Sequence, residues 1–271
     1  MAEKDIHYYE PANGHGLKHD PFNAIVAPRP IGWISSRDAK GNINLAPYSF
    51  FNAFCYKPPI VGFSSTSWKD SVSNIQETEE FCWNLAIMDL AKQMNATSAH
   101  VAHDVNEFTI AGLTATPSKI VRVPRVARSP VSFECRLSEI VRLKRADGGK
   151  AEAWLTLGEV VAVHIDKDFI KDGVYQTALA RPIARAGRRG DYFEIRNLLA
   201  FQSGTSQTDL VAGAECDPPA MTSRRIWRNG APFMQRFARE CPALSSPDPT
   251  FPARLIGSLH SRRQCRRDWC S

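Results

Sequence analysis

The sequence predicts a mainly β protein with a few short helices, built as an antiparallel barrel of about six to eight strands. Short apolar runs bounded by Gly, Pro, Asn and Asp recur along the chain, and several are joined by tight turns, as in β-hairpins. Helical periodicity is confined to two or three short stretches, and strands do not alternate with helices as a parallel sheet requires. Closure into a barrel would remove exposed strand edges.

The first elements in chain order are an irregular polar arm, residues 1–23, and a β-hairpin. Residues 31–36 and 43–51 are apolar and aromatic, and residues 38–42 between them include Gly and Asn, which tolerate left-handed backbone in a tight turn. Pro47 removes a ladder donor from the second strand, so an edge, a bulge or a break is expected there. A broken strand with polar neighbours presents backbone groups to a flat ligand.

Two short helices follow this hairpin. After a strand at residues 60–64, Asp70 or Ser71 is the expected N-cap of a helix that ends near Thr78. A strand at residues 81–86 leads to a second helix from Asp89, with Leu90 and Met94 on its inner face.

The later elements are mostly strands. Residues 98–130 are expected as loop, and residues 131–138 alternate apolar and polar, which predicts a half-buried strand with the polar side chains in solvent. A turn at residues 147–150 connects this strand to a return strand at residues 154–165. A short helix at residues 175–179 and strands at residues 181–185 and 192–195 complete the domain.

The chain divides into a domain, residues 1–200, and a tail, residues 201–271. The tail contains ten Arg, no Lys, six acidic residues and four of the seven Cys, without sustained periodicity. It is expected to be disordered, or non-native through a translated frameshift. Ten Arg minus six acids leaves +4 of the net charge of +6 in the tail and +2 in the domain, so specific nucleic-acid binding is not expected.

Localisation and metal content follow from simple patterns. No apolar run approaches 20 residues and the N-terminus is charged, so we expect a cytoplasmic protein without a membrane span. Cys55, Cys82 and Cys135 lie in apolar runs and are expected as unpaired, small hydrophobic residues. The spacing of His100 and His103 suits a metal site on a helix, but histidines with ordinary hydrogen-bond partners are the simpler interpretation, and no metal is predicted.

The polar loop at residues 64–71 has the composition of an anion site. Several hydroxyl groups, Lys69 and the N–H groups of a helix start can together hold a phosphate monoester. A solvated serine-rich loop that precedes an ordinary helix is the alternative.

Residues 24–98 resemble the flavin reductase-like family, in particular its flavoredoxin-like members. The resemblance is carried by Pro28 to Ser35, Asn44 to Asn52, Val61 to Ser65, Lys69 to Ser71, Asn74 with Ile75, and Met94 to Ser98. Weaker similarity continues to about Arg185 and excludes the tail. It implies an FMN-binding antiparallel split β-barrel of Greek-key type.

The resemblance also implies a function and a site. It implies a homodimer that binds FMN and transfers hydride from NAD(P)H to flavin, with a monooxygenase or another electron acceptor as partner. The flavin would carry the reaction, so no catalytic side chain is assigned. The implied FMN-binding residues are Ser35, Ser36, Ala46, Pro47, Tyr48, Ser49, Asn52, Ser64, Ser65, Lys69, Ser71 and Asn74.

One departure from the family keeps a second function open. Many NADH-using relatives carry Gly-Asp-His before the last long strand, where this chain has Gly148, Gly149 and Lys150. An FMN-binding electron-transfer protein without NAD(P)H turnover is therefore the alternative. A nucleic-acid-binding protein that uses its basic tail is a third hypothesis.

Overall fold

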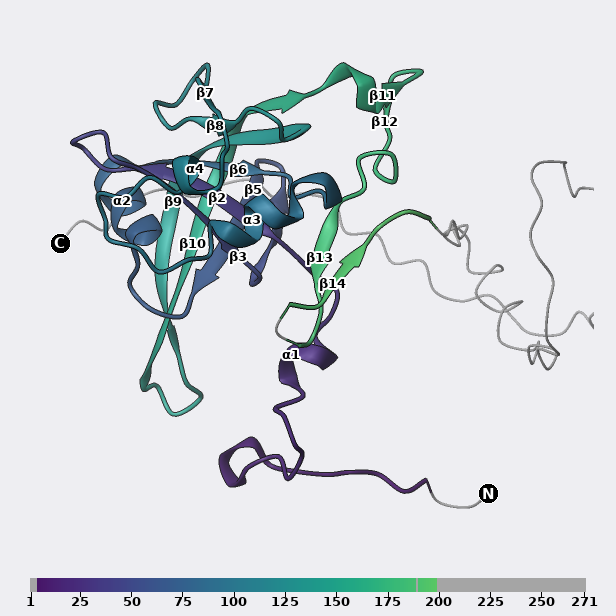
Figure 1. Cartoon of the computed structure of the whole chain (residues 1–271). Coiled ribbons are helices and arrows are strands. Elements are labelled where there is room, and N and C mark those ends of the chain that lie inside the picture. The colour runs from purple at the N-terminus through teal and green to yellow at the C-terminus, as the bar shows by residue number, and fades with distance from the viewer. Residues whose placement is uncertain (1–3, 189, 199–271) are drawn as a thin grey trace, which may run out of the picture. The chain divides into compact units, whose positions relative to one another are not determined.

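One antiparallel sheet forms the centre of the fold. The computed structural model describes residues 4–188 and 190–198 of the 271-residue chain. In these residues seven strands hydrogen-bond in the order β3-β2-β6-β9-β10-β5-β4, with every neighbouring pair antiparallel (Figure 1). Their bounds are β2 Gly32–Arg37, β3 Ile43–Tyr48, β4 Phe51–Tyr56, β5 Pro59–Ser65, β6 Glu80–Asn84, β9 Val131–Lys144 and β10 Lys150–Ile165. The mainly β, antiparallel fold is confirmed.

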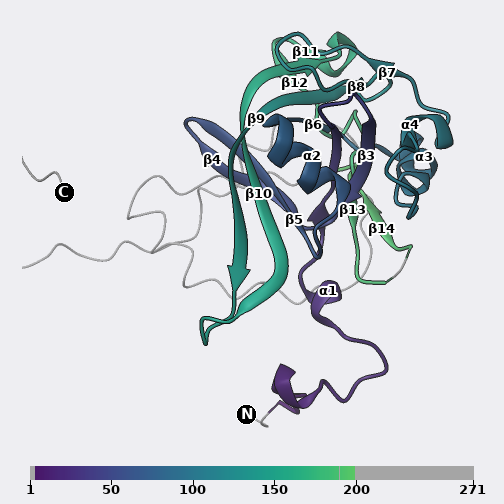
Figure 2. The same cartoon turned by 90° about the vertical axis from the view of Figure 1, so that its left-hand side faces the viewer.

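The sheet is open between its end strands, β3 and β4. No ladder joins these two strands in the part of the chain that the structure describes, so the closed barrel is not found. The sheet curls around α2 (Asp70–Thr78), as Figure 2 shows. Val72 and Ile75 of α2 are fully buried in one apolar cluster with residues from distant strands, including Phe63 and Phe81. A Greek-key order of the strands stays a prediction.

The predicted first hairpin is confirmed as β2 and β3, which pair from Gly32 opposite Tyr48 to Arg37 opposite Ile43. Its second strand is shorter than expected, because the chain bends after Tyr48 and a separate strand, β4, begins at Phe51. Pro47 lies in β3, the edge strand of the sheet, where a missing N–H disturbs one side of the ladder at most. The predicted edge and break are therefore both present.

The two predicted helices are present with small differences. The N-cap of α2 is Lys69, without a side-chain cap, so the prediction of Asp70 or Ser71 as N-cap is wrong by one or two residues. The second helix consists of a 3₁₀ turn, η2 (Met88–Leu90), and α3 (Ala91–Ala96), with Leu90 and Met94 buried as expected. A further short helix, α4 (Glu107–Ile110), lies in the stretch predicted as loop.

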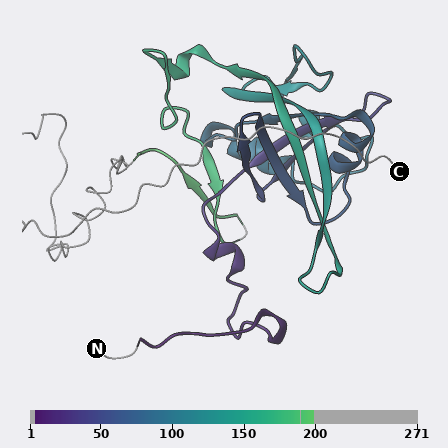
Figure 3. The ribbon, with the colours of Figure 1, turned by 180° about the vertical axis from the view of Figure 1, so that it is seen from behind.

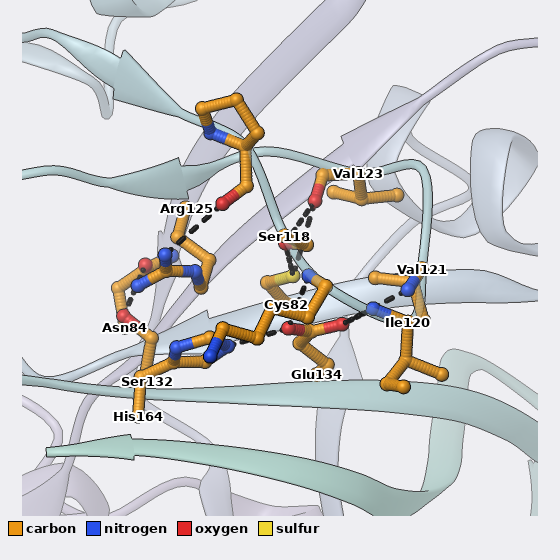
Figure 4. Close-up of polar contacts among 12 residues, drawn as sticks. Cys82, Asn84, Ser118, Ile120, Val121, Val123, Arg125, Ser132, Glu134 and His164 are labelled. Carbon is orange, nitrogen blue, oxygen red and sulfur yellow. Dashed lines mark hydrogen bonds and ion pairs between the residues drawn. The ribbon is translucent and has the colours of Figure 1, made fainter.

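Strands β9 and β10 form a long hairpin that extends past the other strands (Figure 3). Its turn is the predicted one at residues 147–150, where Gly148 has a φ of +85°. The strand alternation is correct for Val131 and Cys135, which are buried, but wrong for Ser132 and Glu134, which are buried as well. A loop, residues 117–124, covers this second face of β9 and binds the Glu134 carboxylate (Figure 4).

Short elements complete the described chain. The arm contains η1 (Pro11–Asn13) and α1 (Phe22–Ile25), and η3 (Lys167–Phe169) follows β10. Three small sheets pair β1 (Arg29–Pro30) with β13 (Ile183–Arg185) and β14 (Tyr192–Glu194), β7 (Ala115–Thr116) with β8 (Arg125–Val126), and β11 (Ile170–Lys171) with β12 (Val174–Tyr175).

The structure also bears on three remaining expectations, which concern a helix, the cysteines and a membrane span. Tyr175 belongs to β12 and residues 177–180 form a turn, so the helix expected at residues 175–179 is wrong. Cys55 is exposed on β4, whereas Cys82 and Cys135 are buried as expected. Among the described residues, no helix is long and apolar enough to cross a membrane. The predicted tail, residues 201–271, lies outside the described residues, and the division into a domain and a tail stays a prediction.

Candidate functional site

Two cavities lie along β3 and share Pro47, Tyr48 and Ser98. The lysine cavity, of about 310 Å³, is lined by Asn44, Ala46, Pro47, Tyr48, Lys69, Asp70, Ser71, residues 97–101 and Glu107. The arginine cavity, of about 420 Å³, is lined by Ile31, Pro47, Tyr48, Ser49, Met94, Asn95, Ser98, Arg185, Gly190 and Tyr192. The edge strand with its internal proline therefore borders both cavities, so a ligand could extend from one into the other.

The lysine cavity is built on the start of α2. The first N–H groups of a helix have no partner within the helix, and the helix dipole places partial positive charge there. Lys69 adds a full positive charge, and Ser71, next along the chain after Asp70, is buried at the same place. Asp70 also lines this cavity and contributes a negative charge. Cation, hydroxyl and helix N–H groups together have the donor chemistry that a phosphate monoester requires.

A buried network of polar side chains supports this wall. The Asn44 amide donates to Ser71 Oγ at 2.8 Å and to Ser36 Oγ at 3.4 Å, and the Asn74 amide donates to Ser36 Oγ at 3.2 Å. Ser36 and Asn74 line neither cavity and lie behind Ser71 and Asn44. Of the predicted residues in this region, Lys69 and Ser71 face the cavity, and Ser36 and Asn74 hold its wall in place.

Ser35 points to the face of β2 opposite that of Ser36, because successive residues of a strand point to opposite faces. Its hydroxyl donates to Pro124 O at 2.6 Å and accepts from the Asn84 amide at 3.3 Å. The side-chain oxygen Oδ1 of Asn84 accepts in turn from Ser132 Oγ (Figure 4) and from Val126 N. Ser35 is thus fully buried in a network that holds the loop before β8 on the sheet, and it lines neither cavity.

Four more of the predicted residues line the cavities. Ala46, Pro47 and Tyr48 line the lysine cavity, and Ser49 lines the arginine cavity with Pro47 and Tyr48. The Tyr48 ring packs on Phe63 with 4.4 Å between ring centres, and burial raises the pKa of the Tyr48 hydroxyl.

The remaining three predicted residues, Asn52, Ser64 and Ser65, line neither cavity. Asn52 is exposed on β4, and its side-chain oxygen accepts from Ala53 N. Ser65 is buried and donates to Ser67 O, and Ser64 is partly buried. The structure therefore brings six of the twelve predicted residues to the two cavities.

A segment that the sequence analysis did not assign to the site, residues 97–101, forms another side of the lysine cavity. It is fixed at Thr97, whose Oγ1 accepts from Trp33 Nε1 at 3.0 Å and donates to Met94 O at 2.7 Å. Residues 94–98 belong to the quoted resemblance, which was the available signal for them. Glu107 was missed entirely: its carboxylate accepts from Leu45 N at 3.0 Å, and burial raises its pKa.

His103, two residues after this segment, contacts two carboxylates from earlier parts of the chain. Its Nε2 lies 3.1 Å from Asp38 Oδ2 in the β2–β3 turn, and its Nδ1 lies 3.0 Å from Asp70 Oδ1 at the start of α2. Hydrogen bonds to Asp38 and then to Asp70 raise the pKa of His103. Burial opposes ionisation of Asp38, but hydrogen bonds from Asn42 and His103 outweigh it and lower the Asp38 pKa to about 2. The histidine thus has two carboxylate partners.

The arginine cavity has a different character. Arg185 of β13 lies over the Tyr192 ring of β14, with its guanidinium carbon 4.8 Å from the ring centre. Both side chains are partly buried. Apolar groups from Ile31 and Met94 and polar groups from Asn95 and Ser98 complete the walls. This cavity combines flat apolar surfaces with one cation.

Comparison with known proteins shows the family of this chain. The family model described as "Flavin reductase like domain" matches residues 26–183, which include every residue that lines the lysine cavity and all of those that line the arginine cavity except Arg185, Gly190 and Tyr192. The chain belongs to the flavin reductase-like family. An uncharacterized protein of Aquifex aeolicus is 33% identical over 175 residues, covering 62% of this chain and 85% of the relative. Another, of Halalkalibacterium halodurans, is 31% identical over 180 residues, covering 63% and 86%.

Solved structures show the same fold. A 2-nitrobenzoate 2-nitroreductase of Pseudomonas fluorescens superimposes with a TM-score of 0.61 at 27% identity, covering 68% of this chain and 89% of its own. A nitrilotriacetate monooxygenase component B of Bacillus cereus gives a TM-score of 0.64 at 24% identity, covering 74% and 98%. A protein with a split barrel domain from Shewanella frigidimarina gives 0.61 at 23%, covering 68% and 90%. The flavin reductase-like chain therefore has the split-barrel fold.

Proposed function

We propose that this protein is an FMN-dependent oxidoreductase that transfers hydride from NAD(P)H to flavin. The observation that carries the proposal is the lysine cavity, where Lys69, Ser71 and the start of α2 lie together beside the edge strand β3 and supply the donors that an anion requires. Membership of the flavin reductase-like family makes a flavin phosphate the anion that fits best. FMN carries one phosphate, and this cavity offers one cationic end for it.

The residues present fit FMN, and each has a defined task. Lys69 and Ser71 would bind the phosphate, with Asn44 holding the Ser71 hydroxyl in place. The backbone of residues 46–49 would contact the flavin along β3 and the bend after it, where these residues line the two cavities and Tyr48 adds a buried surface. Residues 97–101 would exclude water from the phosphate end. When bound, FMN supplies the hydride-transfer chemistry itself, so this chain needs only to bind, orient and shield it.

We also propose that the protein acts as a homodimer. Strand β4 is an edge strand of the sheet (Figure 2). Its exposed apolar side chains include Phe54 and Tyr56, which are 54% and 84% exposed. Cys55 of β4 and Val163 of β10 line one shallow hollow on the sheet. A second copy of the chain would cover this apolar surface.

The partner of the reduced flavin is part of the proposal. One structural neighbour is a monooxygenase component B, which supports a monooxygenase as the electron acceptor. An FMN-binding electron carrier is the second candidate function. It is favoured by the turn at residues 147–150, which lacks Gly-Asp-His and forms the exposed end of the β9–β10 hairpin.

The test is the visible spectrum of the purified protein under anaerobic conditions, followed by addition of NADH and then NADPH. Flavin bands that bleach on addition of a nicotinamide support the reductase. Bands that persist until dithionite is added support the electron carrier. A protein without flavin bands that also takes up no added FMN contradicts both. Loss of nucleic-acid binding after removal of residues 201–271, with the flavin spectrum unchanged, would assign such binding to the tail.

A further inference from the structure

The arginine cavity contains a cation that the proposed FMN site does not use. In the part of the chain that the structure describes, the Arg185 guanidinium forms no ion pair and no hydrogen bond, and its contact is the Tyr192 ring. Arg181, four residues earlier, differs: it pairs with Asp89 and Glu194. Arg185 therefore keeps its charge and its hydrogen-bond donors for a ligand.

The Arg185 guanidinium lies in the cavity next to the one that Lys69 lines. The two cavities meet at Pro47, Tyr48 and Ser98, with Lys69 lining one and Arg185 the other. Oxidised FMN carries its negative charge on the phosphate, which the proposed function assigns to Lys69. Because FMN carries one phosphate, the cation in the adjoining cavity is available to an anionic group of a second molecule, either the nicotinamide donor of the proposed function or another substrate.

The walls define the rest of that molecule. Tyr48 and Tyr192 supply aromatic surface, and Met94 adds an adaptable apolar contact. Asn95 and Ser98 supply side chains that donate and accept hydrogen bonds. Pockets of this kind bind planar apolar groups and orient them through a few polar contacts. The guanidinium plane matches a carboxylate through two parallel hydrogen bonds.

We propose that the arginine cavity binds a small aromatic carboxylate beside the flavin and that Arg185 determines specificity for its carboxylate group. This inference rests on the proposed function, because only a flavin in the adjoining cavity makes such a ligand a second substrate. The binding itself depends on residues that line the arginine cavity, three of which also line the lysine cavity, and it can be measured without turnover.

The experiment uses the full-length protein and two probes of equal shape, benzoate and the neutral benzamide. Isothermal titration calorimetry measures their affinities with and without added FMN. We expect benzoate to bind about tenfold or more tightly than benzamide, the difference that a hydrogen-bonded charge contributes. Arg185→Gln should remove this preference and leave benzamide binding and FMN uptake unchanged. Arg185→Lys should restore part of the preference, since it keeps the charge but loses the planar fork.

A matched control is Arg188→Gln, which removes a neighbouring exposed arginine that does not line this cavity and should leave benzoate binding unchanged. Equal affinity for the two probes, or benzoate binding unaffected by Arg185→Gln, would overturn the proposal. An Arg185→Gln protein with an altered flavin reduction potential and unaltered benzoate binding would also overturn it, since Arg185 would then serve the flavin. A protein that takes up no FMN but binds benzoate through Arg185 would contradict the proposed function and retain this binding site.

Discussion

Asp70 Oδ1 and His103 Nδ1 lie 3.0 Å apart, which joins the first residue of α2 to the segment that closes the lysine cavity. The other ring nitrogen of His103 contacts Asp38 in the β2–β3 turn. A single imidazole thus holds together three segments that are far apart in the sequence.

The raised pKa of His103 gives the contact a defined pH dependence. Its stabilising effect is complete below the unfolded pKa of histidine, near 6.5, and is lost as pH rises through the folded pKa. Asp38, with a pKa lowered to about 2, contributes above about pH 4 and loses its contribution as pH falls toward 2. We expect His103→Gln to lower the melting temperature more at pH 5.5 than at pH 8.5, measured by circular dichroism. An equal effect at both values would contradict the ion pairing.

Lys69→Ala tests the placement of the flavin phosphate. We expect FMN affinity to fall by about 1.5–3 kcal/mol, the contribution of a hydrogen bond to a charged group. Fluorescence titration of the apoprotein with FMN measures it. Lys144→Ala is the control, because Lys144 is exposed near the end of the β9–β10 hairpin and should not affect affinity. Unchanged affinity in Lys69→Ala would place the phosphate elsewhere.

Glu134 is predicted to be a stability residue. Its fully buried carboxylate accepts from three backbone N–H groups, those of Lys119, Ile120 and Val121, and contacts His164 Nε2 at 2.5 Å. Glu134→Ala should lower the free energy of unfolding by about 3–5 kcal/mol, because the groups that remain are buried without their partner. Urea denaturation at pH 7 measures this loss. Glu139→Ala, on an exposed position of the same strand, is the matched control.

The same carboxylate predicts an acid transition. Burial opposes its ionisation, but hydrogen bonds from Lys119 N, His164, Val121 N and Ile120 N outweigh burial and lower its pKa to about 2. This contribution is present above the unfolded pKa of glutamate, near 4.3, and is lost as pH falls toward 2. The stability difference between wild type and Glu134→Gln should therefore shrink between pH 5 and pH 2. A stability difference that stays constant between pH 5 and pH 2 would mean that the charge of Glu134 does not contribute to the free energy of unfolding.

Tyr56→Arg tests the proposed dimer. Tyr56 is 84% exposed in the protomer, so the substitution should leave the protomer folded and weaken association through a desolvated charge. We expect the dimer dissociation constant to rise tenfold or more, about 1.4 kcal/mol, measured by sedimentation equilibrium. Maleimide labelling of Cys55, on the same strand, should become faster. Val174→Arg, at another exposed apolar position, should change neither quantity.

The predictability of this fold varies from element to element. The β2–β3 hairpin and helix α2 could be predicted because turn residues and periodicity act within a few residues of each other. The open sheet could not, since the bend at Ser49 and Phe50 shows no clear local signal beyond the nearby Pro47. The alternation of β9 predicted correctly that Val131 and Cys135 are buried, but it did not predict the burial of Glu134. Alternation shows that one face of a strand is polar, but it cannot show that a loop covers this polar face.

The candidate site shows the same limit. Lys69, Ser71 and residues 46–49 could be placed from the sequence and its resemblance, since they lie in two short runs of recognisable chemistry. Ser35 and Ser36 were predicted together, but adjacent strand residues face opposite sides and neither reaches the cavities. Their hydroxyls are held instead by buried amides.

The sequence by itself determined the local structure of this flavin reductase-like protein: its main strands, its tight turns, helix α2 and the polar loop that contains Lys69. Those features depend on neighbours within a few positions of the chain. The tertiary structure decided which distant residues join that loop, above all His103 and Glu107, and it brought Arg185 to the adjoining cavity. They reach β3 only because the sheet curls and later segments pack against it, and no local pattern specifies contacts between positions more than 60 residues apart.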